Sequence, residues 1–129
     1  MKENKLTIII DRDIQTVFEY TTNPSNTHVR IDFVAEEIAE HYPPIIWTLY
    51  KNHSVDSKIW DIYKVKDFIS NKIFTLTDIE WNYHVQYTYC VIDNQKTELE
   101  YYEWMKDWIL TNPFSSIYLE RLKQILEGR

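Results

Sequence analysis

The sequence contains one glycine, Gly128, in 129 residues. A phosphate-binding P-loop, a G-x-G-x-x-G dinucleotide turn and a G-x-S-x-G nucleophile elbow each require more than one glycine, because the backbone must turn tightly or approach the substrate closely. The chain therefore carries none of these motifs. Nucleotide-binding sites and hydrolase sites of those types are excluded.

Cysteine is equally scarce, and the histidines do not form a metal-binding pattern. Cys90 is the only cysteine, so the chain cannot form an internal disulfide, and we expect a reducing, cytoplasmic location. The four histidines, His28, His41, His53 and His84, are far apart and form no H-E-x-x-H motif. We expect no metal site and no cofactor.

Long hydrophobic runs and clusters of basic residues are also absent. No stretch approaches the roughly 20 apolar residues of a membrane span, and the N-terminal apolar run is too short for a signal peptide. The net charge is −6, and the Lys and Arg residues are scattered along the chain. No basic stripe can neutralise successive phosphates, so we expect no nucleic-acid partner.

Aromatic residues are abundant: the chain has ten Tyr, five Trp and five Phe. Its hydrophobic content of 44% and charged content of 26% are ordinary for a globular protein. A length of 129 residues is close to the usual size of one domain. We therefore expect a single domain over residues 1–129.

The N-terminal pattern predicts a strand followed at once by a short helix. Residues 5–10 are rich in β-branched side chains, and Asp13 is a suitable N-cap for a helix. Asn23-Pro24 should end this helix, because a residue before proline avoids the α region, and a second short turn or helix is expected over 24–30. The apolar face of the first helix has helical spacing and consists of Ile14, Val17, Phe18 and Thr21.

The central part of the chain alternates as antiparallel strands do, with turn residues between the segments. In 83–92 the residues Tyr83, Val85, Tyr87, Tyr89 and Val91 share one face, and His84 points to the other. The predicted strands lie at about 31–40, 45–52, 58–67, 72–79, 83–92 and 96–105.

The last segment predicts an amphipathic helix. Asn112-Pro113 provides an N-cap followed by proline at the first helical position, and Gly128 is a C-terminal cap. The expected apolar stripe consists of Phe114, Ile117, Tyr118, Leu122 and Ile125.

Two stretches of sequence resemble the START-like superfamily, also called the polyketide cyclase or SRPBCC group. The opening, Leu6 to Ile10 followed by Asp13 to Asn26, is similar to that group's strand, Val-Phe-containing helix and T-N-P-x-N turn. The ending, Tyr118 to Glu127, is similar to its last helix. The resemblance implies an α+β helix-grip fold: a curved seven-stranded antiparallel sheet around a long C-terminal helix, with two short helices after the first strand. It also implies a pocket between sheet and helix, which in relatives holds lipids, sterols or polyketides.

The candidate ligand-binding residues are those expected to face this pocket. Large aromatic rings can line an apolar cavity and still offer a hydroxyl or indole N–H to a ligand, although the same rings could instead fill the space completely. The aromatic candidates are Trp47, Tyr63, Tyr87, Tyr89, Tyr101 and Tyr118.

Two charged residues complete the candidate set. Asp61 shares a face with Ile59, Tyr63 and Val65 and would be a desolvated carboxylate if that face were concave. It would be a surface charge if Trp60 and Ile62 faced inward instead. Arg121 lies in the last helix and could meet Glu103 across the pocket, or both could remain solvated.

Three classes of function are consistent with the sequence. The first is a protein that binds a small hydrophobic or amphipathic ligand without catalysis. The second is an enzyme of the cyclase or dehydratase type, in which pocket Tyr or Asp side chains transfer protons. The third is an interaction module or homodimer that uses an exposed patch of Trp104, Trp108 and Ile109.

Overall fold

The computed structural model describes residues 2–128. The strands are β1 (Glu3–Ile10), β2 (Val34–Ala39), β3 (Leu49–Ser54), β4 (Asp61–Ile69), β5 (Ile73–Asp78), β6 (Tyr83–Asp93) and β7 (Lys96–Met105). The helices are α1 (Ile14–Thr22), α2 (Thr27–Arg30) and α3 (Ser116–Glu127), and a 3-10 turn, η1 (Pro24–Asn26), lies between α1 and α2.

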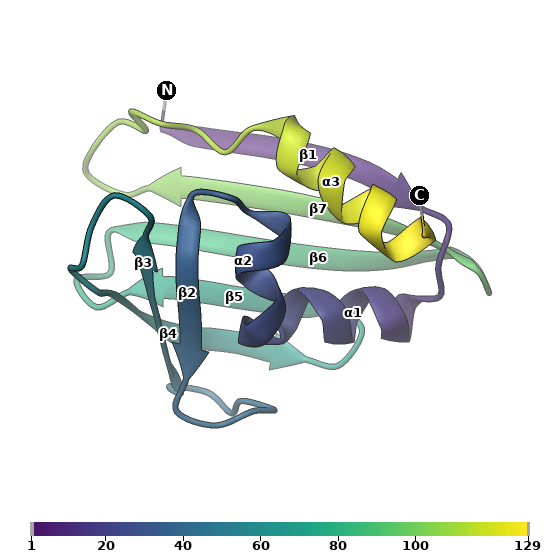
Figure 1. Cartoon of the computed structure of the whole chain (residues 1–129), viewed down its shortest axis with the longest axis horizontal. Helices are drawn as coiled ribbons and strands as arrows, with labels where there is room; N and C mark the ends of the chain where they lie inside the picture. Colours follow the sequence, from purple (N-terminus) through teal and green to yellow (C-terminus); the bar gives the residue numbers. More distant parts are fainter. Residues whose placement is uncertain (1, 129) are drawn as a thin grey trace.

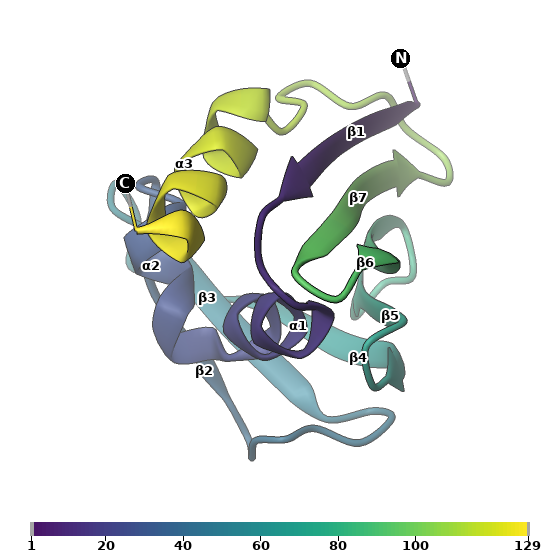
Figure 2. The same cartoon turned by 90° about the vertical axis from the view of Figure 1, so that its right-hand side faces the viewer.

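The strands form one antiparallel sheet in the order β1-β7-β6-β5-β4-β3-β2. The sheet curls strongly, and the helices lie on its concave side (Figures 1 and 2). This is the predicted α+β helix-grip fold, with a seven-stranded sheet, two short helices after the first strand and a helix at the C-terminal end. Within residues 2–128, none of the helices combines the length and the apolar character that a membrane crossing needs.

The β6–β7 pair confirms the predicted alternation. Tyr87 lies opposite Tyr101, and Tyr89 lies opposite Leu99. All four side chains are buried on the concave face, where aromatic and aliphatic cross-strand pairs stabilise a sheet. His84 points to the other face, as predicted, where it stacks on Trp104.

The predicted start and end of the first helix are also confirmed. The Asp13 carboxylate accepts a hydrogen bond from the backbone N–H of Thr16, with 3.2 Å between nitrogen and oxygen. Asn23 is the C-cap of the helix. Phe18 packs edge-on against Tyr89, with 5.0 Å between the ring centroids, so the helix fills one end of the concave face.

The last helix begins later than predicted and buries a different face. Ser115 is its N-cap, and Asn112-Pro113 lies in the preceding loop. The reason is that the backbone N–H of Phe114 donates to the Glu103 carboxylate at 2.6 Å, which ties this loop to the sheet. The buried side chains of α3 are Leu119, Leu122 and Leu126, whereas Ile117 and Ile125 are not buried. Gly128 ends the helix in the left-handed conformation, at φ 75°, as expected for a C-terminal cap.

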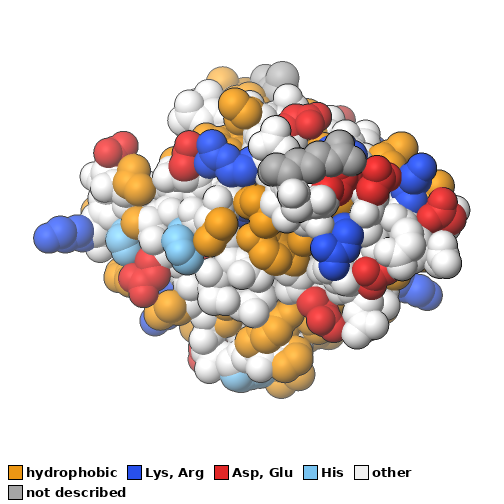
Figure 3. Space-filling view, turned by 45° about the vertical axis from the view of Figure 1, so that its right-hand side comes forward, with side chains coloured by type: hydrophobic (Ala, Val, Ile, Leu, Met, Phe, Trp, Pro, Cys, Tyr) orange, Lys and Arg blue, Asp and Glu red, His pale blue; other side chains and the backbone are white. Residues whose placement is uncertain are grey.

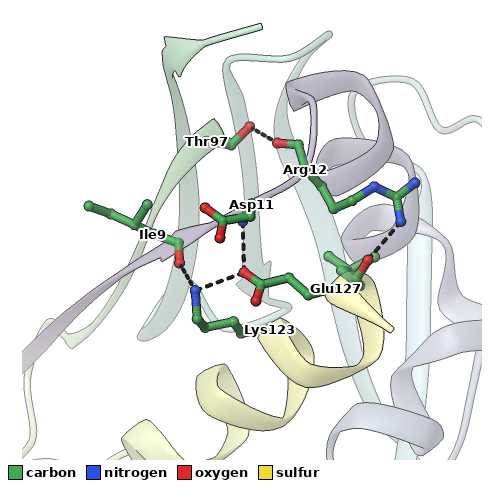
Figure 4. Close-up of polar contacts among 7 residues, drawn as sticks. Ile9, Asp11, Arg12, Thr97, Lys123 and Glu127 are labelled. Carbon is green, nitrogen blue, oxygen red and sulfur yellow. Dashed lines mark hydrogen bonds and ion pairs between the residues drawn. The ribbon is translucent and has the colours of Figure 1, made fainter. Parts of the chain in front are cut away.

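Polar contacts fasten the end of α3 to the corner between β1 and α1 (Figure 4). Lys123 Nζ donates to the Ile9 carbonyl at 2.6 Å and to the Glu127 carboxylate at 2.7 Å. The same carboxylate accepts from the backbone N–H of Asp11 at 2.7 Å. Arg12 donates to the Leu126 carbonyl at 2.6 Å. The helix is therefore held to the sheet by its polar edge as well as by its apolar face.

Three strands begin later than the sequence indicates. β2 begins at Val34 because residues 31–33 form the turn that leaves α2, and β3 begins at Leu49 rather than at 45. Trp47 has φ 75°, a left-handed conformation that no strand residue adopts, so the chain cannot enter the sheet before it. The strand predicted over 58–67 is β4 and begins at Asp61.

Candidate ligand-binding site

A cavity of about 560 Å³ lies between the concave face of the sheet, α2 and the loop before α3. This volume is within the range of about 300–1,000 Å³ that is typical of ligand pockets. Its apolar lining consists of Ile31, Phe33, Val34, Phe74, Leu76, Val85, Pro113 and Phe114. Its tyrosines are Tyr63, Tyr83, Tyr87, Tyr101 and Tyr118. Its other polar residues are Thr21, Thr27, Arg30, Glu37, Asn52, Ser54, Asp61, Glu103, Asn112 and Ser115.

The structure brings five of the candidate residues together around this cavity. They come from β4, β6, β7 and α3, and they are Asp61, Tyr63, Tyr87, Tyr101 and Tyr118. The aromatic rings therefore do not fill the concave side completely, and the space that they leave is large enough for a small molecule.

Three candidate residues, Trp47, Tyr89 and Arg121, lie outside the cavity lining. Trp47 is exposed on the loop between β2 and β3 and packs against Trp81. Tyr89 is on the concave face, but α1 covers it, and its hydroxyl bonds to the hydroxyl of Thr21 at 2.5 Å. Of the two alternatives for Arg121 and Glu103, the contact across the pocket does not form.

Arg121 instead bonds to Asp32, at 3.3 Å between nitrogen and carboxylate oxygen. Both side chains are substantially exposed, so this ion pair contributes little to stability. Its position outside the cavity follows from the helix geometry, because the face of α3 that carries Leu119 and Leu122 is the one turned towards the sheet.

Asp61 has the orientation of one sequence-based alternative and the exposure of the other. Tyr63 lines the cavity and Val65 is fully buried, so the face that carries Asp61 is concave. Asp61 is the first residue of β4, however, and its side chain remains exposed at the edge of the cavity. It is a solvated carboxylate rather than a desolvated one.

Glu103 is a buried carboxylate at one end of the cavity, with 2% of its surface exposed. It accepts hydrogen bonds from the Tyr83 hydroxyl at 2.5 Å, the Asn4 side-chain amide at 2.8 Å and the Phe114 backbone N–H. These donors satisfy the charge of the carboxylate, which explains how it is tolerated in the interior. Tyr101 lies close enough to Tyr83 for each phenol to affect the pKa of the other.

The tyrosines of this group remain neutral phenols. Burial raises the pKa of both Tyr83 and Tyr101, and the nearby Glu103 carboxylate raises them further. Each can therefore donate one proton and accept further hydrogen bonds at physiological pH. Because the Tyr83 proton is directed at Glu103, its hydroxyl oxygen is an acceptor for any group in the cavity.

Glu37 is a second carboxylate in the lining, on β2. It accepts hydrogen bonds from the Thr27 hydroxyl at 2.6 Å and from the Asn52 side-chain amide at 3.0 Å. Burial raises the pKa of Glu37, an effect that these two donors and the charge of Arg30 oppose.

Arg30 ends α2 and is 3% exposed. Its Nη1 donates to the Tyr87 hydroxyl and its Nη2 to the Thr21 carbonyl, both at 3.2 Å. Its guanidinium lies over the Tyr87 ring, 5.4 Å from the centroid. It is the only Lys or Arg among the described residues that line the cavity.

Sequence reasoning missed Arg30, Glu37 and Tyr83 as members of the site. Tyr83 shares the alternating face of Tyr87, so the same pattern could have included it. Glu37 gave no such signal, because the pairing of β2 with β3 shifts between Val34 and Glu36. This bulge lets Val34 and Glu37 line one cavity despite their odd separation in sequence.

Comparisons with known proteins identify the fold but no family. No protein-family model matches the sequence, and no curated protein matches it. The solved structure of XoxI from Bacillus cereus has a TM-score of 0.76 and 10% identity, with 98% of this chain and 96% of that chain covered. The conserved protein of unknown function EF2215 from Enterococcus faecalis has a TM-score of 0.72 and 16% identity, with 95% of this chain and 70% of that chain covered.

The solution structure of the Aha1 dimer from Colwellia psychrerythraea is also similar. Its TM-score is 0.71 at 15% identity, with 98% of this chain and 97% of that chain covered. At these identities the similarity shows a shared curved-sheet fold and carries no function with it.

The acidic residues and the surface drawn in Figure 3 offer no second site of comparable definition among residues 2–128. Within residues 2–128, no group of three or more His, Cys, Asp or Glu side chains is placed to hold a metal ion. On the face drawn in Figure 3, acidic and basic side chains are interspersed, and hydrophobic ones surface in small groups between them. The cavity is therefore the feature on which a function can be argued.

Proposed function

We propose that this protein binds a small hydrophobic or amphipathic ligand in the cavity between its curved sheet, α2 and the start of the C-terminal helix with the loop before it. The observation that carries the proposal is the cavity of about 560 Å³ lined by aliphatic side chains and tyrosines. We also propose that the chain is a single START-like domain and that it acts in the cytoplasm. The resemblance of its first helix and its last helix to that superfamily supports the first of these, and the lone Cys90 supports the second.

The cavity suits an apolar ligand because much of its apolar wall comes from residues held in place by the sheet. Phe74, Leu76 and Val85 come from the adjacent strands β5 and β6, and Phe114 stacks on Tyr101 with 4.2 Å between their centroids. Each square ångström of apolar surface that a ligand buries there contributes about 25 cal/mol. The tyrosine hydroxyls and the charged groups around this wall can orient a polar end of the ligand.

Binding of the neutral dye Nile red tests the proposal directly. We expect one dye molecule to bind per chain with enhanced emission. Val85→Trp should weaken binding at least about tenfold by filling the cavity, because a ligand that loses its space loses its contacts. Val91→Trp is the matched control, since Val91 is on the same strand but exposed and outside the lining. Equal binding by both variants would contradict the proposal.

Native mass spectrometry of the protein purified from its own host provides a second test. We expect a small molecule to remain bound in the wild type and to be lost in the Val85→Trp variant. If the wild type carries no such molecule and does not bind Nile red, the proposal is wrong.

A cyclase-like or dehydratase-like enzyme is the second candidate. The hydrogen bond from Tyr83 to Glu103 in the cavity wall favours it, because a phenol and a carboxylate in contact can exchange a proton with a substrate. In any assay that shows turnover, we expect Tyr83→Phe to lower kcat. Asp61→Asn and Tyr87→Phe test the two other cavity groups, and unchanged rates in all three variants would exclude this candidate.

Self-association is a separate proposal that rests on the segment before α3. Trp108 is 65% exposed and Ile109 56% exposed, whereas Trp104 stacks on His84. We propose that Trp108 and Ile109 lie in a homodimer interface. Sedimentation at high concentration should show a dimer that Trp108→Ser dissociates, and a monomeric wild type would contradict this.

A further inference from the structure

We propose that the ligand of this cavity carries a carboxylate, which binds to the guanidinium of Arg30 and the hydroxyl of Tyr87. This inference rests on the proposed function, because it names the chemical class of the molecule that occupies the same cavity. The apolar body of the ligand would then lie along β5 and β6.

The first step is that Arg30 is a buried cation without an anion in contact. Within residues 2–128, no carboxylate oxygen lies within 4.0 Å of its guanidinium, whose direct partners are a phenol and a carbonyl. A buried charge is costly unless an opposite charge and hydrogen bonds compensate it. A ligand that brings a negative charge to this position therefore gains a strong interaction.

The second step is that two donors at this position have no acceptor. Arg30 Nε is buried and has no hydrogen-bond partner among the described residues. The Tyr87 hydroxyl accepts a hydrogen bond from Arg30 Nη1, and within residues 2–128 its own proton has no acceptor. Because Arg30 and Tyr87 are bonded to each other, both donors belong to one contact pair, and a carboxylate has two oxygens with which to accept from them.

The third step concerns the carboxylates that also line the cavity. Glu37 faces the same region as Arg30, but its oxygens already accept from Thr27 and Asn52. Glu103 lies opposite Val85, one residue pair further along the face than the Tyr87–Tyr101 pair, and Asp61 is exposed at the cavity edge. Glu37 lies close enough to interact electrostatically with Arg30 but does not contact it. Because Arg30 is the one Lys or Arg among the described lining residues, it is still the place where a ligand anion is favoured.

The remaining alternative is that Arg30 has only a structural role. Its bond to the Thr21 carbonyl satisfies the end of α1, and its bond to Tyr87 ties α2 to β6. Such a role leaves Nε unused and predicts no preference for an anionic ligand. The two explanations can therefore be separated by experiment.

The test compares octanoate with 1-octanol, which share an apolar chain of the same length and differ in charge. Each is measured by displacement of Nile red from the wild type and from Arg30→Met. We expect Arg30→Met to weaken the binding of octanoate about tenfold to a hundredfold, as for the loss of a hydrogen-bonded charge pair. The binding of 1-octanol should weaken less than about threefold. Arg121→Met is the control, because it removes the same charge outside the cavity and should change neither affinity.

Tyr87→Phe keeps the test valid if Arg30→Met does not fold. It removes the hydroxyl and keeps the ring, so we expect octanoate to lose about threefold to tenfold in affinity relative to 1-octanol. If Nile red binds but the ratio of octanoate to 1-octanol affinity is the same in wild type and variants, this inference is wrong and the proposed function stands. If neither molecule nor the dye binds to the wild type, the proposed function itself fails.

Discussion

The hydroxyl of Tyr83 on β6 donates a hydrogen bond to the carboxylate of Glu103 on β7, with 2.5 Å between the oxygens. The carboxylate also accepts from Asn4 on β1 and from the backbone of Phe114. The buried Glu103 side chain on β7 therefore links both neighbouring strands, β1 and β6, to the loop that leads into α3. This connection fixes the wall of the cavity at the point where the C-terminal segment crosses the sheet.

The first prediction concerns the stability that Glu103 provides. Glu103→Leu removes the acceptor of the Tyr83 hydroxyl, of the Phe114 N–H and of one Asn4 amide proton, while Asn4 keeps its bond to the Phe114 carbonyl. We expect it to lower the free energy of unfolding by about 3–5 kcal/mol. Glu103→Gln should cost less, because its carbonyl oxygen can still accept from Asn4 and Phe114. Urea unfolding measures both variants.

Tyr83→Phe is the matched control for this prediction. It removes one donor and leaves the carboxylate with its other two, so the expected loss is about 1.5–3 kcal/mol. If Glu103→Leu proved no less stable than the wild type, Glu103 would not hold the loop to the sheet.

The second prediction is a pH dependence of stability caused by Glu37. Its pKa is raised in the folded protein, mainly by burial. Between the unfolded pKa, about 4.3, and the raised folded value, the folded state binds more protons than the unfolded state. The free energy of unfolding should therefore fall as pH rises through this window.

Glu37→Gln removes the titrating group and should flatten this part of the profile. Urea unfolding at a series of pH values that rises from the unfolded pKa of a glutamate, about 4.3, measures the slope. Glu98→Gln is the charge-matched control, because Glu98 is exposed on β7, and it should keep the slope of the wild type. An unchanged slope in Glu37→Gln would show that another group causes the dependence.

Elements with a strong local pattern were predictable from the sequence. The alternation in β6 needs only the period of a strand, and the Asp13 cap needs only one side chain and the N–H groups beside it. The Gly128 cap is equally local, because a left-handed residue is needed to end the helix. In each case the physical cause lies within a few residues of the position that it explains.

Features that depend on distant contacts were not predictable in this way. The start of α3 moved to Ser115 because Phe114 bonds to Glu103, eleven residues away. Tyr89 has the same orientation as Tyr87, but α1 covers it and excludes it from the cavity. Arg30 reaches the cavity from the short helix α2, and Glu37 reaches it from the bulged strand β2. Neither element has a regular sequence periodicity that would predict which side chains face the cavity.

The third prediction concerns the helix cap at Asp13. Its carboxylate accepts from the backbone N–H of Thr16 and also from the Thr16 hydroxyl, at 2.6 Å. Asp13→Ala removes both acceptors and should lower the free energy of unfolding by about 0.5–2 kcal/mol. Asp13→Ser retains an N-cap oxygen and should recover most of the loss. Thermal unfolding followed by circular dichroism measures both, and equal losses would show that capping is not the cause.

The fourth prediction separates the two possible apolar faces of the C-terminal helix. Leu122 is fully buried between α3 and the sheet, whereas Ile117 is 58% exposed, although sequence periodicity placed both in one stripe. Leu122→Ala should therefore lower the free energy of unfolding by about 2–5 kcal/mol, and Ile117→Ala by less than about 0.5 kcal/mol. Urea unfolding of the two variants measures this difference.

The same pair of variants also tests whether the grip on the helix and the cavity are separate features. Leu122 does not line the cavity, so the folded Leu122→Ala protein should bind Nile red as tightly as the wild type while unfolding at lower urea concentration. Comparable losses of stability in Leu122→Ala and Ile117→Ala would mean that α3 presents a different face to the sheet. A loss of dye affinity in folded Leu122→Ala would mean that the packing of α3 determines the shape of the cavity as well.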